Sequence, residues 1–241
     1  MENIHNFRGL AEGLRNKEGR QIKKNMIYRS GELSKASNDD IQKLINFNIN
    51  TIYDLRSPYE QLNQLKHPHF EILNFNVSQS TSKKRMDPDF LIKLAQSDVE
   101  QFMISLYRDY LALSTVLKPL FQHIIHQRDP FMFHCSAGKD RTGIVGTLLM
   151  DLLDFDMSSI YKEYLQIDPR ILEEAMNHQR SDGLSEEIIN KIKPLSGIDP
   201  KYLDEFYKTI YKNYKTMDEY FQQFIGLSKD EILTFKNHYL E

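Results

Sequence analysis

The sequence predicts a mixed α/β fold: a short central sheet, mainly parallel, flanked by helices and followed by a helical C-terminal region. Two observations support this. Short apolar runs of strand character alternate with amphipathic stretches in the first 134 residues. Beyond that point the chain continues as a series of helix-forming segments with helical spacing of apolar residues.

The individual elements follow from apolar periodicity and capping residues. Strands are predicted at residues 26–30, 49–54, 70–77 and 130–133. A helix at 39–47 is capped by Ser37 or Asn38, and the segment from Ser57 to Glu60 has a capping-box pattern with proline at the first helical position. The other helices are predicted at residues 98–113, 114–127, 142–153, 158–165, 171–178, 185–192, 201–214, 216–225 and 228–238.

Length and composition indicate one globular domain, residues 1–241, with 40% hydrophobic and 27% charged residues. The net charge of −3 provides no basic field, so we expect no nucleic-acid partner. No run approaches the ~18 consecutive apolar residues of a membrane span, so we expect no integral membrane segment. The first residues lack the apolar region of a signal peptide. We therefore expect a cytoplasmic protein, or a secreted one if a leader has been removed.

The segment HCSAGKDRTG, residues 134–143, holds the only cysteine of the chain. Cys135 stands six residues before Arg141, between a predicted strand and a predicted helix. Unpaired amides and the positive end of the helix dipole make such a junction an anion site, and arginine adds a planar fork for two phosphate oxygens. We expect the cradle to be lined by the backbone amides of Ser136, Ala137, Gly138, Lys139 and Asp140.

The same cradle favours the thiolate form of Cys135 and places it beside a bound phosphoryl group. Cys135 is therefore predicted to be a nucleophile that forms a phosphocysteine intermediate, with Arg141 binding phosphate and stabilising the transition state. Thr142 either donates a hydrogen bond to the departing thiolate or caps the helix. His134 is expected to hold the loop through backbone hydrogen bonds. This chemistry needs no metal and no cofactor.

The loop resembles the signature of the cysteine-based protein tyrosine phosphatase superfamily, and its HC-x-x-GKDRTG form resembles a bacterial branch of tyrosine-specific and lipid-type phosphatases. Further blocks are similar and stand in the same order, at 6–10 (NFRGL), 28–34 (YRSGELS), 51–60 (TIYDLRSPYE) and the helical tail 197–240. The resemblance implies a protein tyrosine phosphatase-like fold and a dual-specificity hydrolase. Its substrates would be proteins phosphorylated on tyrosine, serine or threonine, or phosphoinositides, and its product inorganic phosphate.

A departing alcohol needs a proton, and three positions are candidates for the general acid. Asp140 lies inside the loop, and the resemblance indicates that an in-loop aspartate can serve. Asp54 ends a predicted strand, where its carboxylate either faces the cleft or pairs with Arg56. The third candidate is Asp87 or Asp89, after the strand at 70–77. We favour Asp140.

Other features leave alternatives open. Lys139 either attracts substrates with several negative groups, such as phosphoinositides, or is a solvated residue of the loop rim. The run 83–85 (KKR) is either a solvated loop or a recruiter of acidic substrates, and the segment 83–113 is a candidate lid. Two alternative functions use similar loops: a rhodanese-like sulfurtransferase and an inactive phospho-ligand-binding module. The pairing of Cys135 with Arg141 argues against both.

Overall fold

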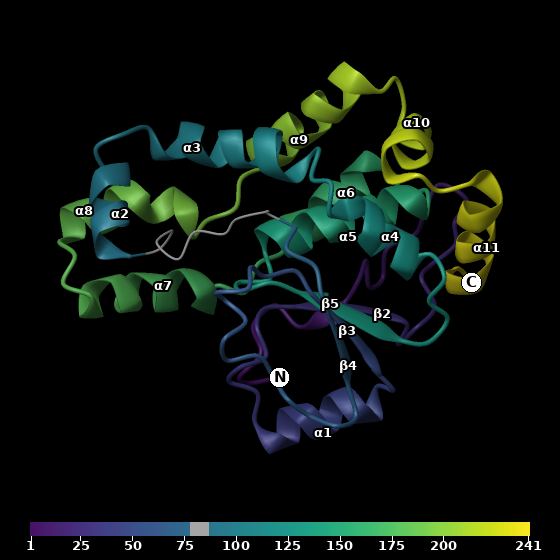
Figure 1. Cartoon of the computed structure of the whole chain (residues 1–241), viewed down its shortest axis with the longest axis horizontal. Coiled ribbons are helices and arrows are strands. Elements are labelled where there is room, and N and C mark those ends of the chain that lie inside the picture. Colours follow the sequence, from purple (N-terminus) through teal and green to yellow (C-terminus); the bar gives the residue numbers. More distant parts are fainter. Residues whose placement is uncertain (78–86) are drawn as a thin grey trace.

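The computed structural model describes residues 1–77 and 87–241. Its centre is a five-stranded sheet in the order β1-β2-β5-β3-β4 (Figure 1). The strand β1 pairs antiparallel to β2, and the other neighbours pair in parallel. The predicted α/β class with a mainly parallel sheet is therefore confirmed. The strands are β1 (Arg8–Gly9), β2 (Ile27–Ser30), β3 (Thr51–Asp54), β4 (Glu71–Asn74) and β5 (Phe131–His134).

The three central strands end at the same level of the sheet. Ser30 at the end of β2 and Asp54 at the end of β3 both stand in register with His134 at the end of β5. Every residue of these three strands is buried, as is typical of parallel strands covered on both faces. The carboxyl edge of the sheet, where α/β proteins bind their ligands, therefore presents the start of the HCSAGKDRTG loop.

Helices cover both faces of the sheet, with α1 on one side and α4, α5 and α6 on the other (Figure 1). Ser37 is the N-cap of α1, in a capping box with Asp40. The helices are α1 (Asn38–Asn46), α2 (Pro88–Leu94), α3 (Val99–Ser105), α4 (Leu117–Ile124), α5 (Asp140–Leu152), α6 (Met157–Tyr164), α7 (Arg170–Ser181), α8 (Glu186–Ile192), α9 (Pro200–Asn213), α10 (Met217–Glu219) and α11 (Lys229–Tyr239), with a short 3₁₀ turn at Lys193–Leu195. No helix among the described residues has the length and apolar character needed to cross a membrane.

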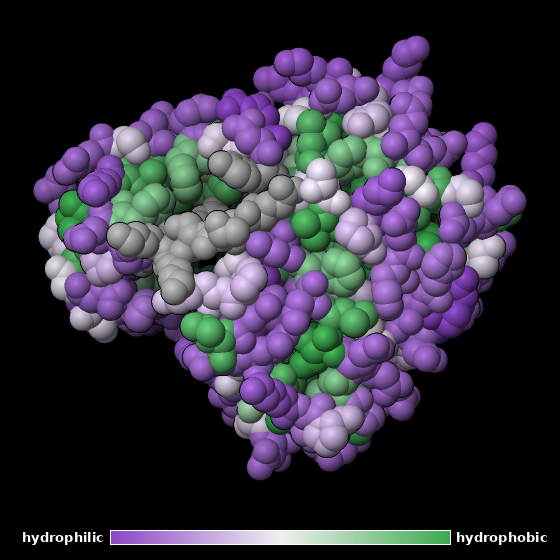
Figure 2. Space-filling model, in the orientation of Figure 1, coloured by the Kyte–Doolittle hydropathy of each residue, from purple (hydrophilic) through white to green (hydrophobic). Residues whose placement is uncertain are grey.

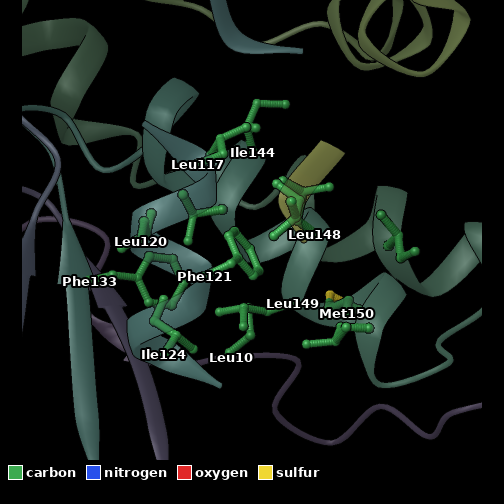
Figure 3. Packing of buried hydrophobic residues seen from close by; sticks show 14 of the residues in the cluster. Leu10, Leu117, Leu120, Phe121, Ile124, Phe133, Ile144, Leu148, Leu149 and Met150 are labelled. Carbon is green, nitrogen blue, oxygen red and sulfur yellow. The ribbon is translucent and has the colours of Figure 1, made fainter. Parts of the chain in front are cut away.

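Three apolar clusters hold these layers together. The largest packs α4 and α5 against the sheet and includes Phe121, Leu148 and Phe133 of β5 (Figure 3). A second cluster lies between the sheet and α1 and includes Leu44. The third joins α2 to α8 away from the sheet. The surface is largely hydrophilic, and apolar side chains reach it around α2, where Ile92 is exposed (Figure 2).

Some predicted elements are wrong in type or extent. The segment from Ser57 to Glu60 forms turns and not a helix, although the Glu60 carboxylate accepts hydrogen bonds from the amide and hydroxyl of Ser57 as a capping box would. The predicted helices at 98–113 and 216–225 each end in a π-helical segment, η1 (Leu106–Leu111) and η3 (Tyr220–Ile225). The Tyr220 hydroxyl donates to the Ala112 carbonyl directly after η1, at 2.9 Å. A contact between distant parts of the chain thus links the two irregular segments.

Candidate active site

The HCSAGKDRTG loop runs from the end of β5 into the first turn of α5. Cys135 lies at its base and is 2% exposed. His134 is buried, and burial lowers the pKa of its imidazole, which favours the neutral ring. Its Nδ1 lies 3.2 Å from the Cys135 carbonyl oxygen. With the proton on Nδ1, His134 donates to the loop backbone, the structural role that the sequence predicts.

The protein satisfies the carbonyls of the loop and leaves its amides free. Each carbonyl oxygen of residues 135–138 accepts a hydrogen bond. The Cys135 carbonyl accepts from the His134 ring and the Ser136 carbonyl from the Glu32 amide at 2.9 Å. The Ala137 carbonyl accepts from Asn6 Nδ2 and the Gly138 carbonyl from Arg29 Nη2, both at 2.8 Å. Within the described part of the chain, no backbone N–H of residues 136–141 donates a hydrogen bond. Free amides at the N-terminus of a helix form an anion site. An arrangement of this kind can accept an oxyanion beside Cys135.

Gly138 allows the loop to lie directly against the end of β2. Its φ is +72°, a left-handed conformation that favours glycine. A Cβ atom at this position would stand 2.5 Å from the Gly31 nitrogen and 2.6 Å from the Ser30 carbonyl. Any side chain would therefore displace the loop from the strand.

A buried ionic network supports the loop from below. Arg29 is 1% exposed, and besides the Gly138 carbonyl it contacts Glu163 of α6, with 3.2 Å between Nη1 and Oε1. Arg8 of β1 pairs with the same carboxylate at 2.9 Å. Burial, aided by repulsion from Arg8, lowers the pKa of Arg29 to about 10. The side chain therefore stays charged at neutral pH and can hold both the carbonyl and the carboxylate.

Arg141 is held by Glu60 through two hydrogen bonds. Its Nη1 lies 2.8 Å from Oε2 and its Nη2 lies 2.7 Å from Oε1, and the Ser136 hydroxyl donates to the same carboxylate. Burial alone would raise the pKa of Glu60, but the hydrogen bonds and charge of Arg141 hold it below its usual range. Nη2 also donates to Ser136. Since a guanidinium has five N–H groups, two are left for a phosphate.

Asp140 and Lys139 form a second charged group beside the loop. Lys139 is 3% exposed, and its Nζ donates to the Gly197 carbonyl at 2.8 Å and to Asp140 Oδ1 at 3.1 Å. The Asp140 side chain is 28% exposed. The Asp140 carboxylate is thus partly open to solvent. The Lys139 ammonium, in contrast, is buried and already forms hydrogen bonds with Asp140 and the Gly197 carbonyl. Of the two alternatives for Lys139, the structure shows neither a solvated rim residue nor a free cation.

Asp54 is fully buried in an ion pair with Arg56. Both carboxylate oxygens accept from Arg56, at distances of 2.8–3.1 Å, and His134 Nε2 lies 3.7 Å from Oδ2. Burial acts to raise the pKa of Asp54, but these partners hold it below the ordinary value. An ionised carboxylate without solvent access is a poor proton donor, so the structure favours the pairing alternative for Asp54.

The Thr142 hydroxyl is buried and has no hydrogen-bond partner among the described residues. The N-cap of α5 is Lys139, without a side-chain cap, so the structure does not place Thr142 as a cap. An unpaired buried hydroxyl costs about 1–3 kcal/mol. The structure therefore leaves this hydroxyl available as a hydrogen-bond donor and does not use it as a cap.

The remaining acid candidates lie on α2. The Asp87 carboxylate caps this helix by accepting from the Phe90 amide at 2.8 Å, and Asp89 is exposed in its first turn. Neither forms a hydrogen bond or ion pair with the loop in the described structure. The basic run 83–85 and the start of the candidate lid lie outside the described residues, and the lid stays a prediction. No cluster of three or more metal-ligating side chains occurs in the ranges described.

Comparison with known proteins identifies the family. The model of the tyrosine phosphatase family matches residues 1–241. The protein belongs to this family. A protein of Cupriavidus necator, named provisionally as a tyrosine-protein phosphatase, is 25% identical over 247 residues, which cover 100% of this chain and 87% of the relative. A tyrosine-protein phosphatase of Nostoc commune is 40% identical over 68 residues, 25% of this chain and 23% of that protein.

Among solved structures, TpbA of P. aeruginosa is 14% identical, with 71% of this chain and 86% of that chain covered at a TM-score of 0.34. A score this low supports no detailed structural correspondence. The family assignment of this phosphatase therefore rests on the match along its whole sequence.

Sequence reasoning missed the residues that support the loop in this phosphatase. Asn6, Arg29 and Glu60 stand in the blocks that resemble the family, but their partners lie between 81 and 131 positions away in the chain. The one available signal concerned the partner of Arg141 in general and not Glu60 itself. A phosphate-binding arginine that is buried without its ligand needs a carboxylate partner, but nothing in the sequence distinguishes Glu60 from the other acidic residues.

Proposed function

We propose that the protein is a cysteine-dependent phosphatase that hydrolyses phosphate monoesters through a phosphocysteine intermediate. The observation that carries this proposal is the ring of free amides at residues 136–141 above Cys135, beside a pre-oriented Arg141. Such an arrangement neutralises the charge on the equatorial oxygens of a transferring phosphoryl group. We further propose that residues 1–241 act as one phosphatase domain.

The steps follow from the chemistry of these groups. The Cys135 thiolate attacks phosphorus, the bond to the ester oxygen breaks, and Asp140 gives its proton to that oxygen. Asp140 then takes a proton from water, which attacks the phosphocysteine and releases inorganic phosphate and the thiolate. The unpaired Thr142 hydroxyl supplies a hydrogen bond to the sulfur as it leaves.

For the substrate we propose proteins phosphorylated on tyrosine, with phosphoserine and phosphothreonine as further substrates. Phosphoinositides are a second candidate class, which Lys139 would favour if its charge reached a second phosphate. The contacts of Lys139 with Asp140 and the Gly197 carbonyl weigh against that use, because they would have to break first. Initial rates on phosphotyrosine and phosphoserine peptides and on phosphoinositide vesicles would rank these classes.

The decisive test is hydrolysis of an aryl phosphate by wild type and by Cys135→Ser. We expect the variant to lose at least about 10³-fold in kcat, and acid quenching of the wild-type reaction to trap a phosphoenzyme that the variant does not form. A variant as fast as wild type would exclude the mechanism. Thiosulfate turnover without phosphatase activity would support a sulfurtransferase, and phosphopeptide binding without turnover would support a binding module.

A further inference from the structure

Tyr107 connects the helical segment before α4 to the candidate acid. It stands in the first turn of the π-helix η1 and is fully buried. The backbone bond from the Ala112 amide to the Tyr107 carbonyl, at 3.1 Å, spans five residues. Its hydroxyl donates to Asp140 Oδ1 at 2.7 Å. Single π-helical turns occur frequently at functional sites.

The two oxygens of Asp140 have different surroundings. Both hydrogen bonds to the carboxylate go to Oδ1, one from Tyr107 and one from Lys139. The Lys139 ammonium nevertheless contacts both oxygens, since its Nζ lies 2.9 Å from Oδ2. The Tyr107 hydroxyl is therefore the contact that distinguishes the two oxygens. When the carboxyl is protonated, the Tyr107 hydroxyl that donates to Oδ1 leaves Oδ2 as the oxygen for the proton.

Packing fixes Tyr107 independently of its hydroxyl. Its ring stacks on Tyr202 of α9, with centroids 5.5 Å apart, and meets Tyr164 of α6 edge-on at 6.4 Å. The Tyr164 hydroxyl donates to the Tyr107 hydroxyl at 3.0 Å. Burial raises the pKa of Tyr107 well above its ordinary value, so its hydroxyl keeps its proton as a donor throughout the neutral range.

We propose that Tyr107 is a positioning residue for proton transfer: it binds Oδ1 of Asp140 so that Oδ2 carries the proton to the leaving oxygen. This inference rests on the proposed function, in which Asp140 is the general acid. It also gives the helical segment that contains η1 a direct influence on turnover, because a displacement of η1 moves the hydroxyl that orients the acid.

Tyr107→Phe tests this, since it removes one hydroxyl and retains the stacked ring. A phosphoserine peptide has a poor leaving group that needs the proton, whereas p-nitrophenyl phosphate has a good one that does not. For the variant we expect kcat on the peptide to fall about tenfold, the magnitude of one lost hydrogen bond. On the aryl ester, kcat should change less than about twofold. The KM values for both substrates should be unaltered, and the alkaline limb of the pH profile of kcat on the peptide should be displaced.

Tyr202→Phe is the matched control, because it alters the other ring of the stack without touching Asp140, and it should retain wild-type rates on both substrates. In the double variant Tyr107→Phe, Asp140→Asn we expect no loss beyond that of Asp140→Asn alone. Equal losses of Tyr107→Phe on both substrates, or wild-type rates on both, would overturn the inference.

The two proposals fail in distinguishable ways. If Asp140→Asn is slowed on the peptide while Tyr107→Phe is not, the positioning role is wrong and the phosphatase mechanism stands. If Asp140→Asn keeps its rate on the peptide, the acid lies elsewhere and the positioning role falls with it. Only an active Cys135→Ser enzyme would refute the nucleophile itself.

Discussion

Glu60 holds Arg141 through two hydrogen bonds of 2.7 and 2.8 Å, so the guanidinium proposed to bind phosphate is oriented by the protein itself. The carboxylate comes from a turn after β3 and the arginine from the first turn of α5. Bidentate pairs of this kind combine strength with fixed geometry. In the proposed mechanism a phosphate would meet an arginine whose conformational freedom is already lost, which would lower the entropic cost of binding.

Replacing Glu60 by glutamine should release Arg141. The amide retains the shape of the side chain but has no charge and offers one acceptor oxygen in place of two. We expect kcat/KM on an aryl phosphate to fall about 10- to 100-fold, and inhibition by phosphate to weaken in parallel. Glu186→Gln, which breaks the exposed two-point pair of Arg180 on α7, is the matched control and should leave the kinetics unaltered. Unchanged kinetics in Glu60→Gln would show that Arg141 needs no partner.

Asn6→Asp should disturb the loop without altering the local backbone. Asn6 Nδ2 donates to the Ala137 carbonyl and its Oδ1 accepts from the Asp168 amide at 2.7 Å. An aspartate would set a carboxylate against the Ala137 carbonyl, which should cost about 1–3 kcal/mol of stability and weaken vanadate binding severalfold. Asn16→Asp is the control, because Asn16 forms the same kinds of hydrogen bond away from the loop. Its Nδ2 donates to the Leu153 carbonyl, and its Oδ1 accepts from the amides of residues 18 and 20. It should lose stability but bind vanadate normally.

Gly138→Ala should remove the close approach between the loop and β2. The new methyl group would collide with backbone atoms at 2.5–2.6 Å, so we expect more than ~3 kcal/mol of destabilisation or a displaced, inactive loop. Gly183 has a similar φ of +83° but open space around it. Gly183→Ala should therefore cost only the conformational strain, about 1 kcal/mol. Thermal unfolding and phosphate binding of the two variants would separate strain from collision.

Asp151 should make the stability of the protein depend on pH. Burial raises its pKa to about 7, although the Tyr207 hydroxyl, which donates to its Oδ2 at 2.8 Å, acts in the opposite direction. A carboxyl whose pKa is raised on folding contributes stability below its unfolded value, near ~4, and loses it as the pH rises through the folded value. The contribution of Asp151 to the stability of wild type should therefore fall as the pH rises from about 4 to about 7.

Asp151→Asn removes that titration and tests the sign. Relative to wild type, we expect the variant to gain on the order of 2 kcal/mol in the free energy of unfolding between pH 5 and pH 8, measured by urea denaturation. The exposed Asp218→Asn serves as control and should show no such pH-dependent difference. A constant difference between Asp151→Asn and wild type at all pH values would contradict the shifted titration.

Local signals in the sequence predicted the regular elements well. The predicted strand before Cys135 and the predicted helix after it define the loop between β5 and α5. The apolar spacing of Ile144, Leu148, Leu149 and Leu152 predicts that helix, and all four residues are buried. Apolar periodicity is a local property, so it can be read over one or two turns. The same signal failed where distant contacts decide the backbone, as in the two π-helical segments and in the turn at Ser57, whose capping partner Glu60 binds Arg141 across the fold.

The sequence by itself determined the family and the proposed chemistry, through a single cysteine, an arginine six positions later and small residues between them. Only the tertiary structure decided how each group is held. It paired Asp54 with Arg56, buried the charge of Lys139 against Asp140, and brought Tyr107 to one oxygen of that carboxylate. The reason is physical. The proposed nucleophile and anion site lie within ten consecutive residues, whereas the orientation of a buried charge depends on partners that only folding brings together.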